Sequence, residues 1–337
     1  MRIAVDKTSI GVVKDDSNYY IYLFDDENIN TLLDIGIRCV RWDKCDFVDI
    51  NLTDYKVDCI KQAKLTDKDW DKIQKIDHKI GIIIPNYNYG DCIEKSINSV
   101  LSQTYKNFEI VFVDDVSTDD SVIKAKKLLK PPHKVIELKQ KRYNGGARNE
   151  AYLHFSEDVD YVMCLDSDDW LIDEYALDKI NNKLQTNVDV LFMGIAEYKN
   201  NTTRVFYVPR YENKYDALSG WSGCGKVIKK TLTIKQECLY NEGTLKEDKN
   251  QHCKICIYMN SFGVLGEPIY VWNRQNVKSV TTARQNVMWK TSTIRHYADT
   301  LQLYEMVKGK DNKIDRYLEN RLRLTKNEME TGGDAQW

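Results

Sequence analysis

The sequence predicts an α/β protein with a doubly wound, mainly parallel sheet. From Lys79 onward, short apolar runs alternate with segments in which apolar residues recur at helical spacing. The predicted strands cover residues 80–84, 108–113 and 135–138, and the predicted helices cover 92–103, 117–129 and 147–155. Alternation of this kind is typical of a parallel sheet whose two faces are covered by helices.

The alternation continues into the second half of the chain. The run 160–164 indicates a buried strand, followed by a helix at 171–185 and a strand at 188–195. The stretch 198–222 is rich in Tyr and has no clear periodicity. We therefore expect it to be a flexible or substrate-facing region, because loops on a rigid scaffold commonly carry recognition.

The chain is predicted to have three parts. Residues 77–283 form the main domain, and residues 284–337 form a helical C-terminal segment. Residues 1–76 form a small α+β accessory unit, with strands at 10–13, 19–24, 37–41 and 47–52 and helices at 28–35 and 65–76. A homo-oligomer contact is expected through the first or the last part. Acceptor binding or simple packing is the alternative role of residues 1–76.

Composition excludes some classes of protein. The 337 residues carry a formal charge of −2, which is unlike the strongly basic balance of a general nucleic-acid binder. Nine cysteines at irregular spacing, with no secretory signal, predict reduced thiols in a cytoplasmic protein. No apolar run approaches the roughly 20 residues that span a membrane, so no transmembrane segment is expected.

The acidic segment Asp166-Ser167-Asp168-Asp169 follows directly after the strand predicted at 160–164. Ligands bind outside the carboxyl ends of strands in open α/β sheets. Mg²⁺ and Mn²⁺ prefer carboxylate oxygens and usually bind with one or two carboxylates plus substrate phosphates. The segment therefore indicates a metal–diphosphate site; taken alone, an acidic cap on the next helix explains it equally well.

Three further segments are predicted to lie at the same edge of the sheet. They are Pro85-Asn86-Tyr87-Asn88, Asp114-Asp115-Val116-Ser117 and Gly145-Gly146-Ala147-Arg148. An aromatic such as Tyr87 can stack on a nucleobase, and the Asp115 carboxylate can accept hydrogen bonds from a base or ribose. The glycines allow close approach to a ligand at a helix start, and Arg148 offers a planar fork to a carbonyl or phosphate.

In order and spacing, these four segments resemble glycosyltransferase family 2, whose members have the GT-A fold. The resemblance covers about residues 78–283. It implies that Pro85, Tyr87 and Asp115 line a nucleotide pocket with Arg148 nearby. It also implies that Asp166-Ser167-Asp168 is a DxD motif, with Asp166 facing the ribose and Asp168 holding the metal that bridges two phosphates.

A second acidic pair, Glu247-Asp248, precedes a helix predicted to run to about Met259. It resembles the Glu-Asp motif of the family, in which a carboxylate is the general base. Asp248 is the predicted base, with Glu247 as an alternative base or as a group that orients Asp248. Outside this context, two acidic residues in a first helical turn are more simply explained by the helix dipole.

Two basic residues complete the predicted site. Lys226, in a segment that resembles the one before the family's acceptor helix, is predicted to face the donor or acceptor. Arg274, in a segment that resembles the family's final strand, is predicted to close on the diphosphate. Most surface lysines and arginines have no specific role, so both assignments depend on the resemblance.

Two other patterns have simpler explanations. His252-Cys253-Lys254-Ile255-Cys256 contains a CxxC with an adjacent His, but nothing is spaced to complete four zinc ligands. Buried cysteines on a helix are the preferred interpretation. Tyr207, Tyr211, Tyr215 and Trp221 form either a platform for a sugar or part of the packing.

These observations predict a metal-dependent, inverting glycosyltransferase that uses Mn²⁺ or Mg²⁺. It is expected to move a hexose or N-acetylhexosamine from a UDP-sugar to an acceptor hydroxyl. A surface polysaccharide or teichoic acid is the preferred acceptor, and a protein side chain or a modified DNA base is an alternative. The competing hypothesis is a catalytically inactive module that binds a sugar nucleotide or glycan. Nucleotidyl transfer is disfavoured because residues 85–88 are not a glycine-rich, basic triphosphate loop.

Overall fold

The main sheet is built on apolar runs that are buried along their whole length. Every residue of β5 (Ile80–Asn86) and β6 (Phe108–Asp114) is buried, the pattern of parallel strands covered on both faces. The strands predicted at 80–84, 108–113 and 135–138 are confirmed, the third as β7 (Lys134–Glu137). An α/β fold with a mostly parallel, curled sheet is likewise confirmed.

The computed structural model describes residues 76–220, 223–235, 238–276 and 287–331, together with the strands that lie between residues 9 and 65. Contacts along the backbone divide the chain into two compact units. One is Met1–Asp77 with Leu184–Asn187, and the other is His78–Lys183 with Val188–Trp337. The three-part domain division stays a prediction.

The first unit contains a four-stranded sheet in the order β3-β1-β2-β4. Its strands are β1 (Ser9–Asp15), β2 (Asn18–Leu23), β3 (Arg38–Cys39) and β4 (Lys61–Leu65). β1, β2 and β3 overlap the strands predicted at 10–13, 19–24 and 37–41. β4 ends at Leu65, where a helix was expected to begin. The elements predicted at 28–35 and 47–52, and residues 66–75, lie outside the described residues.

The second unit contains a nine-stranded sheet in the order β7-β6-β5-β8-β12-β10-β13-β9, with β11 paired to β10. β7, β6, β5 and β8 are parallel, whereas β12 joins β8 to β10 in antiparallel pairing. The remaining strands are β8 (Tyr161–Cys164), β9 (Trp170–Leu171), β10 (Val190–Lys199), β11 (Thr202–Tyr207), β12 (Lys226–Lys229) and β13 (Phe262–Asn273).

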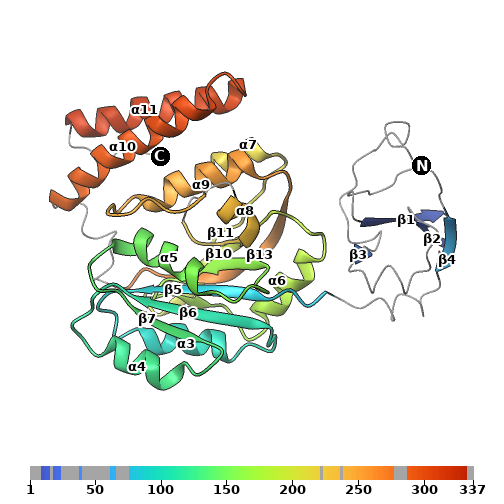
Figure 1. Ribbon diagram of the computed structural model, residues 1–337, viewed down its shortest axis with the longest axis horizontal. Helices are drawn as coiled ribbons and strands as arrows, with labels where there is room; N and C mark the ends of the chain where they lie inside the picture. The colour runs from blue at the N-terminus through green and yellow to red at the C-terminus, as the bar shows by residue number, and fades with distance from the viewer. Residues whose placement is uncertain are drawn as a thin grey trace. The chain divides into compact units, whose positions relative to one another are not determined.

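Helices cover both faces of the parallel strands (Figure 1). α3 and α4 lie on one face of β5–β7, and α5 lies on the other. The helices are α3 (Ile93–Leu101), α4 (Ser121–Leu128), α5 (Tyr143–His154), α6 (Ala176–Leu184), α7 (Lys214–Leu218), α8 (Lys230–Lys235), α9 (Glu247–Tyr258), α10 (Val287–Val307) and α11 (Asn312–Thr331). The helical C-terminal segment is confirmed. No helix in the described part of the chain has the length and apolarity needed to cross a membrane.

Three helices begin away from their predicted starts. The helix predicted at 171–185 begins at Ala176, because Trp170 and Leu171 form β9 and pair with β13. Hydrogen bonds explain the other two shifts. α4 begins at Ser121 rather than 117, because the side chains of Asp114 and Ser117 hold a turn after β6. α5 begins at Tyr143 rather than 147, because the Asp115 carboxylate accepts the first free backbone N–H groups of that helix. A further difference is in 198–222, which has no clear periodicity in sequence but contains β11 and α7.

Candidate active site

The carboxyl ends of β5, β6 and β8 meet at one edge of the sheet. Asn86 is level with Asp114 in the pairing of β5 with β6, and Ile83 is level with Cys164 in the pairing of β5 with β8. The acidic segment 166–169 follows β8 directly. The sheet therefore brings the segments predicted around Pro85, Asp115 and Asp166 to a common edge.

The acidic turn divides its side chains between the core and the open side. The Ser167 hydroxyl donates to the Pro85 carbonyl at 2.7 Å, and Asp169 accepts from the Tyr270 hydroxyl at 2.5 Å and the Asn273 N–H at 2.8 Å. Both residues are buried. Asp166 and Asp168 remain partly exposed. The turn thus presents the two carboxylates of the DxD pattern, while Ser167 and Asp169 hold it in place.

Asp168 lies in an unusually acidic environment. Burial, and then the charge of Asp166, raise its pKa to about 6. Its Oδ2 accepts a hydrogen bond of 2.7 Å from the Asn276 side chain. Burial, followed by the charges of Asp168 and Asp166, also raises the pKa of the Tyr89 hydroxyl. A cation placed here would relieve this concentration of negative charge.

The carboxylates of the turn suit a hard divalent cation. Asp168, with Asp166 beside it, supplies the one or two carboxylates that Mg²⁺ or Mn²⁺ usually takes when substrate phosphates complete the shell. Among the described residues, no group of three or more His, Cys, Asp or Glu side chains could hold a metal without such help. The fit is therefore to a metal that arrives with a diphosphate.

Arg148 joins the two acidic motifs of the chain. Its guanidinium donates to Asp166 Oδ1 at 2.7 Å and to Glu247 Oε1 at 2.8 Å, and it lies over the Tyr240 ring. The side chain is buried, so its hydrogen bonds go to these two carboxylates. A contact of Arg148 with the donor stays a prediction, since the structure uses its fork for Asp166 and Glu247.

Glu247 and Asp248 begin α9 but differ in environment. Glu247 is buried, and its pKa is raised to about 7 by that burial; the nearby Arg148 opposes the shift and the charge of Asp248 adds to it. Asp248 is only partly buried. Lys226 lies close enough for the Asp248 charge to raise its pKa, although burial lowers that pKa overall. The Lys226 ammonium donates to the Gly223 carbonyl at 2.6 Å.

The residues predicted to hold the nucleotide have other contacts as well. Both Asp115 oxygens accept backbone N–H groups, from Arg142 at 2.6 Å and Tyr143 at 2.8 Å. The Tyr87 ring is exposed, and the Lys141 ammonium lies over it. Asp115 thus orders the start of α5, while Tyr87 offers an accessible aromatic face.

The Arg274 side chain contacts residues outside the acidic turn. Its guanidinium donates to Glu197 Oε2 at 3.0 Å and lies over the Trp272 ring. Its neighbours Asn273 and Asn276 are the residues that contact Asp169 and Asp168. The backbone of this segment reaches the site, and a diphosphate contact by the Arg274 side chain stays a prediction.

The two glycines before Arg148 serve close packing within the protein. A Cβ on Gly145 would lie 2.3 Å from the Asn241 carbonyl oxygen, and one on Gly146 would lie 2.3 Å from Arg142 Cβ. The close approach expected toward a ligand is instead an approach of α5 to the segment before α9. This contact holds Arg148 and Glu247 at their pairing distance.

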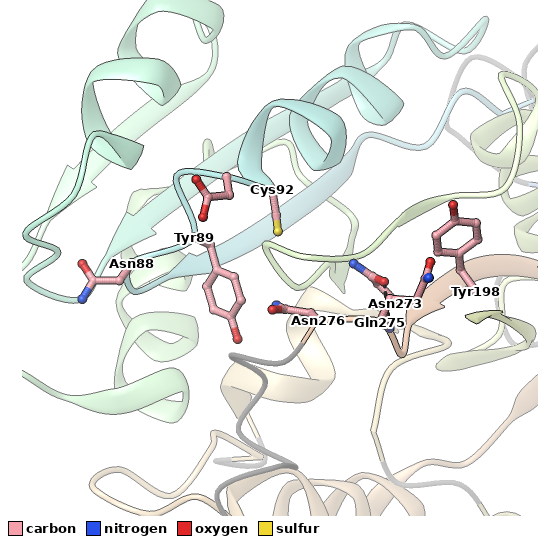
Figure 2. Close-up of a pocket in the computed structure, with 8 residues that line it drawn as sticks. Asn88, Tyr89, Cys92, Tyr198, Asn273, Gln275 and Asn276 are labelled. Carbon is pink, nitrogen blue, oxygen red and sulfur yellow. Dashed lines mark hydrogen bonds between the residues drawn. The ribbon is translucent and has the colours of Figure 1, made fainter. Parts of the chain in front are cut away.

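Sequence reasoning missed a cavity of about 340 Å³ beside the acidic turn (Figure 2). Its lining is rich in amide and aromatic side chains: Asn88, Tyr89, Asp91, Cys92, Tyr198, Asn273, Gln275 and Asn276. The amide residues at and just after the end of β13, Asn273, Gln275 and Asn276, were the available signal. A lining without Lys or Arg suits a neutral polar ligand more than an anion.

The buried-cysteine interpretation of the CxxC segment is confirmed. Cys253 and Cys256 are unpaired thiols in a core cluster that α9 shares with β10, β12, α10 and α11. Burial lowers the pKa of His252 to about 3, and its Nε2 lies 2.8 Å from the Ala217 carbonyl. Tyr211 and Tyr215 pack against the same cluster, which supports packing over a sugar platform; Trp221 lies outside the described residues.

A mostly parallel curled sheet with an acidic turn at its carboxyl edge defines a GT-A type fold. The family model described as glycosyl transferase family 2 matches residues 81–254. The chain belongs to this family.

Curated relatives match parts of the chain. Glycosyltransferase GlyA of Streptococcus pneumoniae is 27% identical over 221 residues, 58% of this chain and 31% of the relative. The Escherichia coli UDP-Glc:alpha-D-GlcNAc-diphosphoundecaprenol beta-1,3-glucosyltransferase WfgD is 30% identical over 150 residues, which are 44% of this chain and 58% of WfgD. The poly(ribitol-phosphate) beta-N-acetylglucosaminyltransferase TarP of Staphylococcus aureus is 34% identical over 122 residues, which are 34% of this chain and 36% of TarP. Each match spans less than two thirds of the relative.

Solved structures share the fold. S. aureus TarS 1–349 in complex with UDP-GlcNAc has a TM-score of 0.58 and 20% identity, over 72% of this chain and 70% of TarS. The mannosyltransferase PcManGT from Pyrobaculum calidifontis, in complex with GDP-Man and Mn²⁺, has a TM-score of 0.53 and 16% identity, over 72% and 68%.

Proposed function

We propose that this protein is a metal-dependent, inverting glycosyltransferase that moves a hexose or N-acetylhexosamine from a UDP-sugar to an acceptor hydroxyl. The observation that carries the proposal is the pair of hydrogen bonds from Arg148 to Asp166 and Glu247. One buried side chain thereby ties the DxD turn to the start of α9. This link fixes the distance between the carboxylates proposed to hold the donor and the segment that carries the proposed base, and a single displacement needs both at one site.

The chemistry follows from the side chains at the sheet edge. The acceptor oxygen attacks the anomeric carbon, the bond from that carbon to the diphosphate oxygen breaks, and UDP leaves with the electron pair. Asp248 takes the proton of the acceptor hydroxyl, a role typically worth 10²–10⁴-fold in rate. Asp168 would hold a divalent cation, which would supply charge neutralisation for the leaving diphosphate. One displacement inverts the anomeric centre.

Asp248 is favoured over Glu247 as the base by its surroundings. Glu247 is buried and its Oε1 accepts from Arg148, whereas Asp248 is partly exposed next to Lys226. Glu247 then orients Arg148 and, through it, Asp166.

For the donor, the UDP-GlcNAc complex of TarS supports a UDP-sugar. For the acceptor, TarP and WfgD support a teichoic-acid or surface-polysaccharide chain. The Mn²⁺ complex of the mannosyltransferase supports a divalent metal. We place Pro85, Tyr87 and Asp115 at the nucleotide and Lys226 and Arg274 at the phosphates or acceptor.

The test is nucleotide release from a panel of UDP-, GDP-, CMP- and dTDP-sugars, each with Mn²⁺, with Mg²⁺ and with chelator. We expect slow release from one UDP-sugar that needs metal. Asp168→Asn and Asp248→Asn should each lower it at least 100-fold, whereas Asp158→Asn, at an exposed ion pair with Lys79, should not.

Two outcomes would contradict the proposal. Wild-type rates of nucleotide release in both the Asp168 and Asp248 variants would show that the proposed metal ligand and the proposed base are wrong. Tight, metal-dependent UDP binding without release, even when polymeric acceptors are added, would instead indicate a binding module.

A further inference from the structure

The segment before the candidate base is held by the C-terminal helices. The Leu245 N–H donates to the Ser292 hydroxyl of α10 at 2.9 Å. Gly243 has a positive φ of 67°, and a Cβ there would lie 3.0 Å from the Arg295 guanidinium of the same helix. The residues leading into Glu247 and Asp248 are therefore positioned by α10.

Lys246, the residue immediately before the pair, is tied to α11. Its ammonium forms an ion pair with Glu328 Oε1, and the two residues are 4% and 6% exposed. The same Glu328 oxygen accepts from the Thr293 hydroxyl of α10 at 3.2 Å. One carboxylate thus links α10, α11 and the N-cap of α9.

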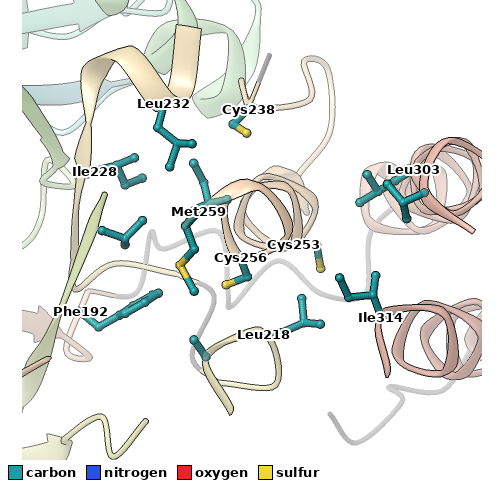
Figure 3. Packing of buried hydrophobic residues seen from close by; sticks show 14 of the residues in the cluster. Phe192, Leu218, Ile228, Leu232, Cys238, Cys253, Cys256, Met259, Leu303 and Ile314 are labelled. Atoms are coloured by element: carbon teal, nitrogen blue, oxygen red, sulfur yellow. The ribbon is translucent and has the colours of Figure 1, made fainter. Parts of the chain in front are cut away.

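The interface of α9 with α10 and α11 has an apolar zone and a polar zone. Near the turn between α10 and α11, Leu303 and Ile314 pack in one cluster with Cys253 and Cys256 of α9 (Figure 3). The other end has buried charged and polar residues of α10 and α11: Ser292, Thr293, His296, Arg321, Thr325 and Glu328. Of these, Ser292 and Glu328 contact the segment before α9. Apolar contacts supply non-directional attraction, whereas the polar zone accepts only one arrangement.

Stability alone gives no reason for a buried Lys246–Glu328 pair. Replacing buried ion pairs by apolar residues is often neutral or stabilising, because desolvation offsets the attraction between the charges. A lysine at an N-cap also opposes the helix dipole. What the pair does supply is a defined position for the backbone that carries Glu247 and Asp248.

We propose that Glu328 is a positioning residue for the transfer reaction, acting through Lys246 to set the geometry of Glu247 and Asp248. The proposal rests on the function proposed above for that pair. In this proposal the α10–α11 hairpin contributes to catalysis by positioning the start of α9, without contact between the hairpin and the substrate.

The test uses the full chain and three variants. Glu328→Gln removes the negative charge, and Lys246→Met with Glu328→Leu removes both charges, so that no buried charge is left unpaired. Leu318→Ala is the control, because Leu318 is fully buried in the apolar zone of the same hairpin. The Leu318→Ala substitution weakens the packing of the hairpin at a place distant from its contacts with residues 243–246.

Two readouts are compared at a temperature at which all variants are folded. Hydrogen exchange over residues 243–250 is expected to be at least tenfold faster in both Glu328 variants than in wild type, and unchanged in Leu318→Ala. For nucleotide release, kcat is expected to fall 10- to 100-fold in the Glu328 variants while KM for the UDP-sugar stays within twofold.

Wild-type exchange and kcat in the double variant would overturn the proposal. So would an equal effect in Leu318→Ala, which would mean that the hairpin matters only for stability. If wild-type protein released no nucleotide from any donor, even with polymeric acceptors added, the proposed function would fail. Hydrogen exchange would still decide whether Glu328 positions the start of α9.

Discussion

At the scale of single residues, Arg148 and Glu247 show how burial sets charge. A buried carboxyl group normally favours its neutral form, and the raised pKa of Glu247, about 7, reflects that burial. The Arg148 guanidinium works in the opposite direction. Together with Asp166 they form a chain of three ionisable groups in which each hydrogen bond restricts the position of the next.

The raised pKa has a consequence for stability. A carboxyl group whose folded-state pKa lies above its unfolded value near 4.5 loses stabilising free energy as pH rises from about 4.5 to about 7. Glu247→Gln, whose amide oxygen can still accept from Arg148, should therefore raise the free energy of unfolding at pH 8 by roughly 1–3 kcal/mol. It should give no gain at pH 4.5.

Urea unfolding at both pH values measures this difference. Glu157→Gln, at an exposed position, is the control and should leave the unfolding free energy within 0.5 kcal/mol of wild type. Parallel pH dependence in wild type and Glu247→Gln would show that Glu247 is ionised in the folded protein without cost.

At the scale of elements, α5 and the segment before α9 are in direct contact at Gly145. A methyl group there would lie 2.3 Å from the Asn241 carbonyl oxygen and 3.2 Å from Glu247 Cβ. Because the first contact is to backbone, relief requires a shift of the segment. Gly145→Ala is expected to lower the free energy of unfolding by about 1–3 kcal/mol.

The matched control is Gly266→Ala in β13, where a Cβ would have nothing within 4 Å. Its unfolding free energy, measured in urea alongside that of Gly145→Ala, should stay within about 0.5 kcal/mol of wild type. Equal losses of unfolding free energy at the two positions would mean that the effect at Gly145 comes from the backbone conformation of glycine and not from close packing.

At the scale of the whole molecule, ligand and metal binding should be visible in the unfolding temperature. A ligand at 100 times its Kd stabilises the folded state by about 2.7 kcal/mol. For a chain of this size, UDP with Mn²⁺ should raise Tm by roughly 4 °C. Asp168→Asn should remove the metal-dependent part and keep any shift caused by UDP alone.

Differential scanning fluorimetry with UDP, with and without Mn²⁺ or chelator, checks this expectation. The control is Mn²⁺ without nucleotide, which should shift Tm little, because the carboxylates of the turn need phosphates to complete the metal shell. An equal shift in chelator would show that the nucleotide binds without metal and that Asp168 has another role.

Much of the sheet was predictable because its signal is local. The run 80–84 carries no polar side chain, the run 108–113 is apolar except for Glu109, and the observed strands extend them only to Asn86 and Asp114. The start of α5 was not predictable in this way. It depends on Asp115, a residue 28 positions before Tyr143, whose carboxylate accepts the N–H of that residue.

In the candidate site, too, some features were predictable from the sequence and others depend on contacts between distant residues. Residue types and motif order were sufficient to single out Asp166, Asp168, Glu247 and Asp248. The sequence could not show that Asp169 is tied to Tyr270, that Arg274 pairs with Glu197, or that Asn276 contacts Asp168. Each of these contacts joins residues 77 or more positions apart.

The amino-acid order of this protein therefore determines which segments become strands and helices and which carboxylates follow them, since those depend on neighbours along the chain. The tertiary structure alone decides which carboxylates remain accessible to a ligand and which are buried and hydrogen-bonded within the protein. It also decides that Arg148 bridges Asp166 and Glu247 and that Glu328 reaches Lys246. The physical reason is that burial and charge pairing are properties of groups brought together by folding.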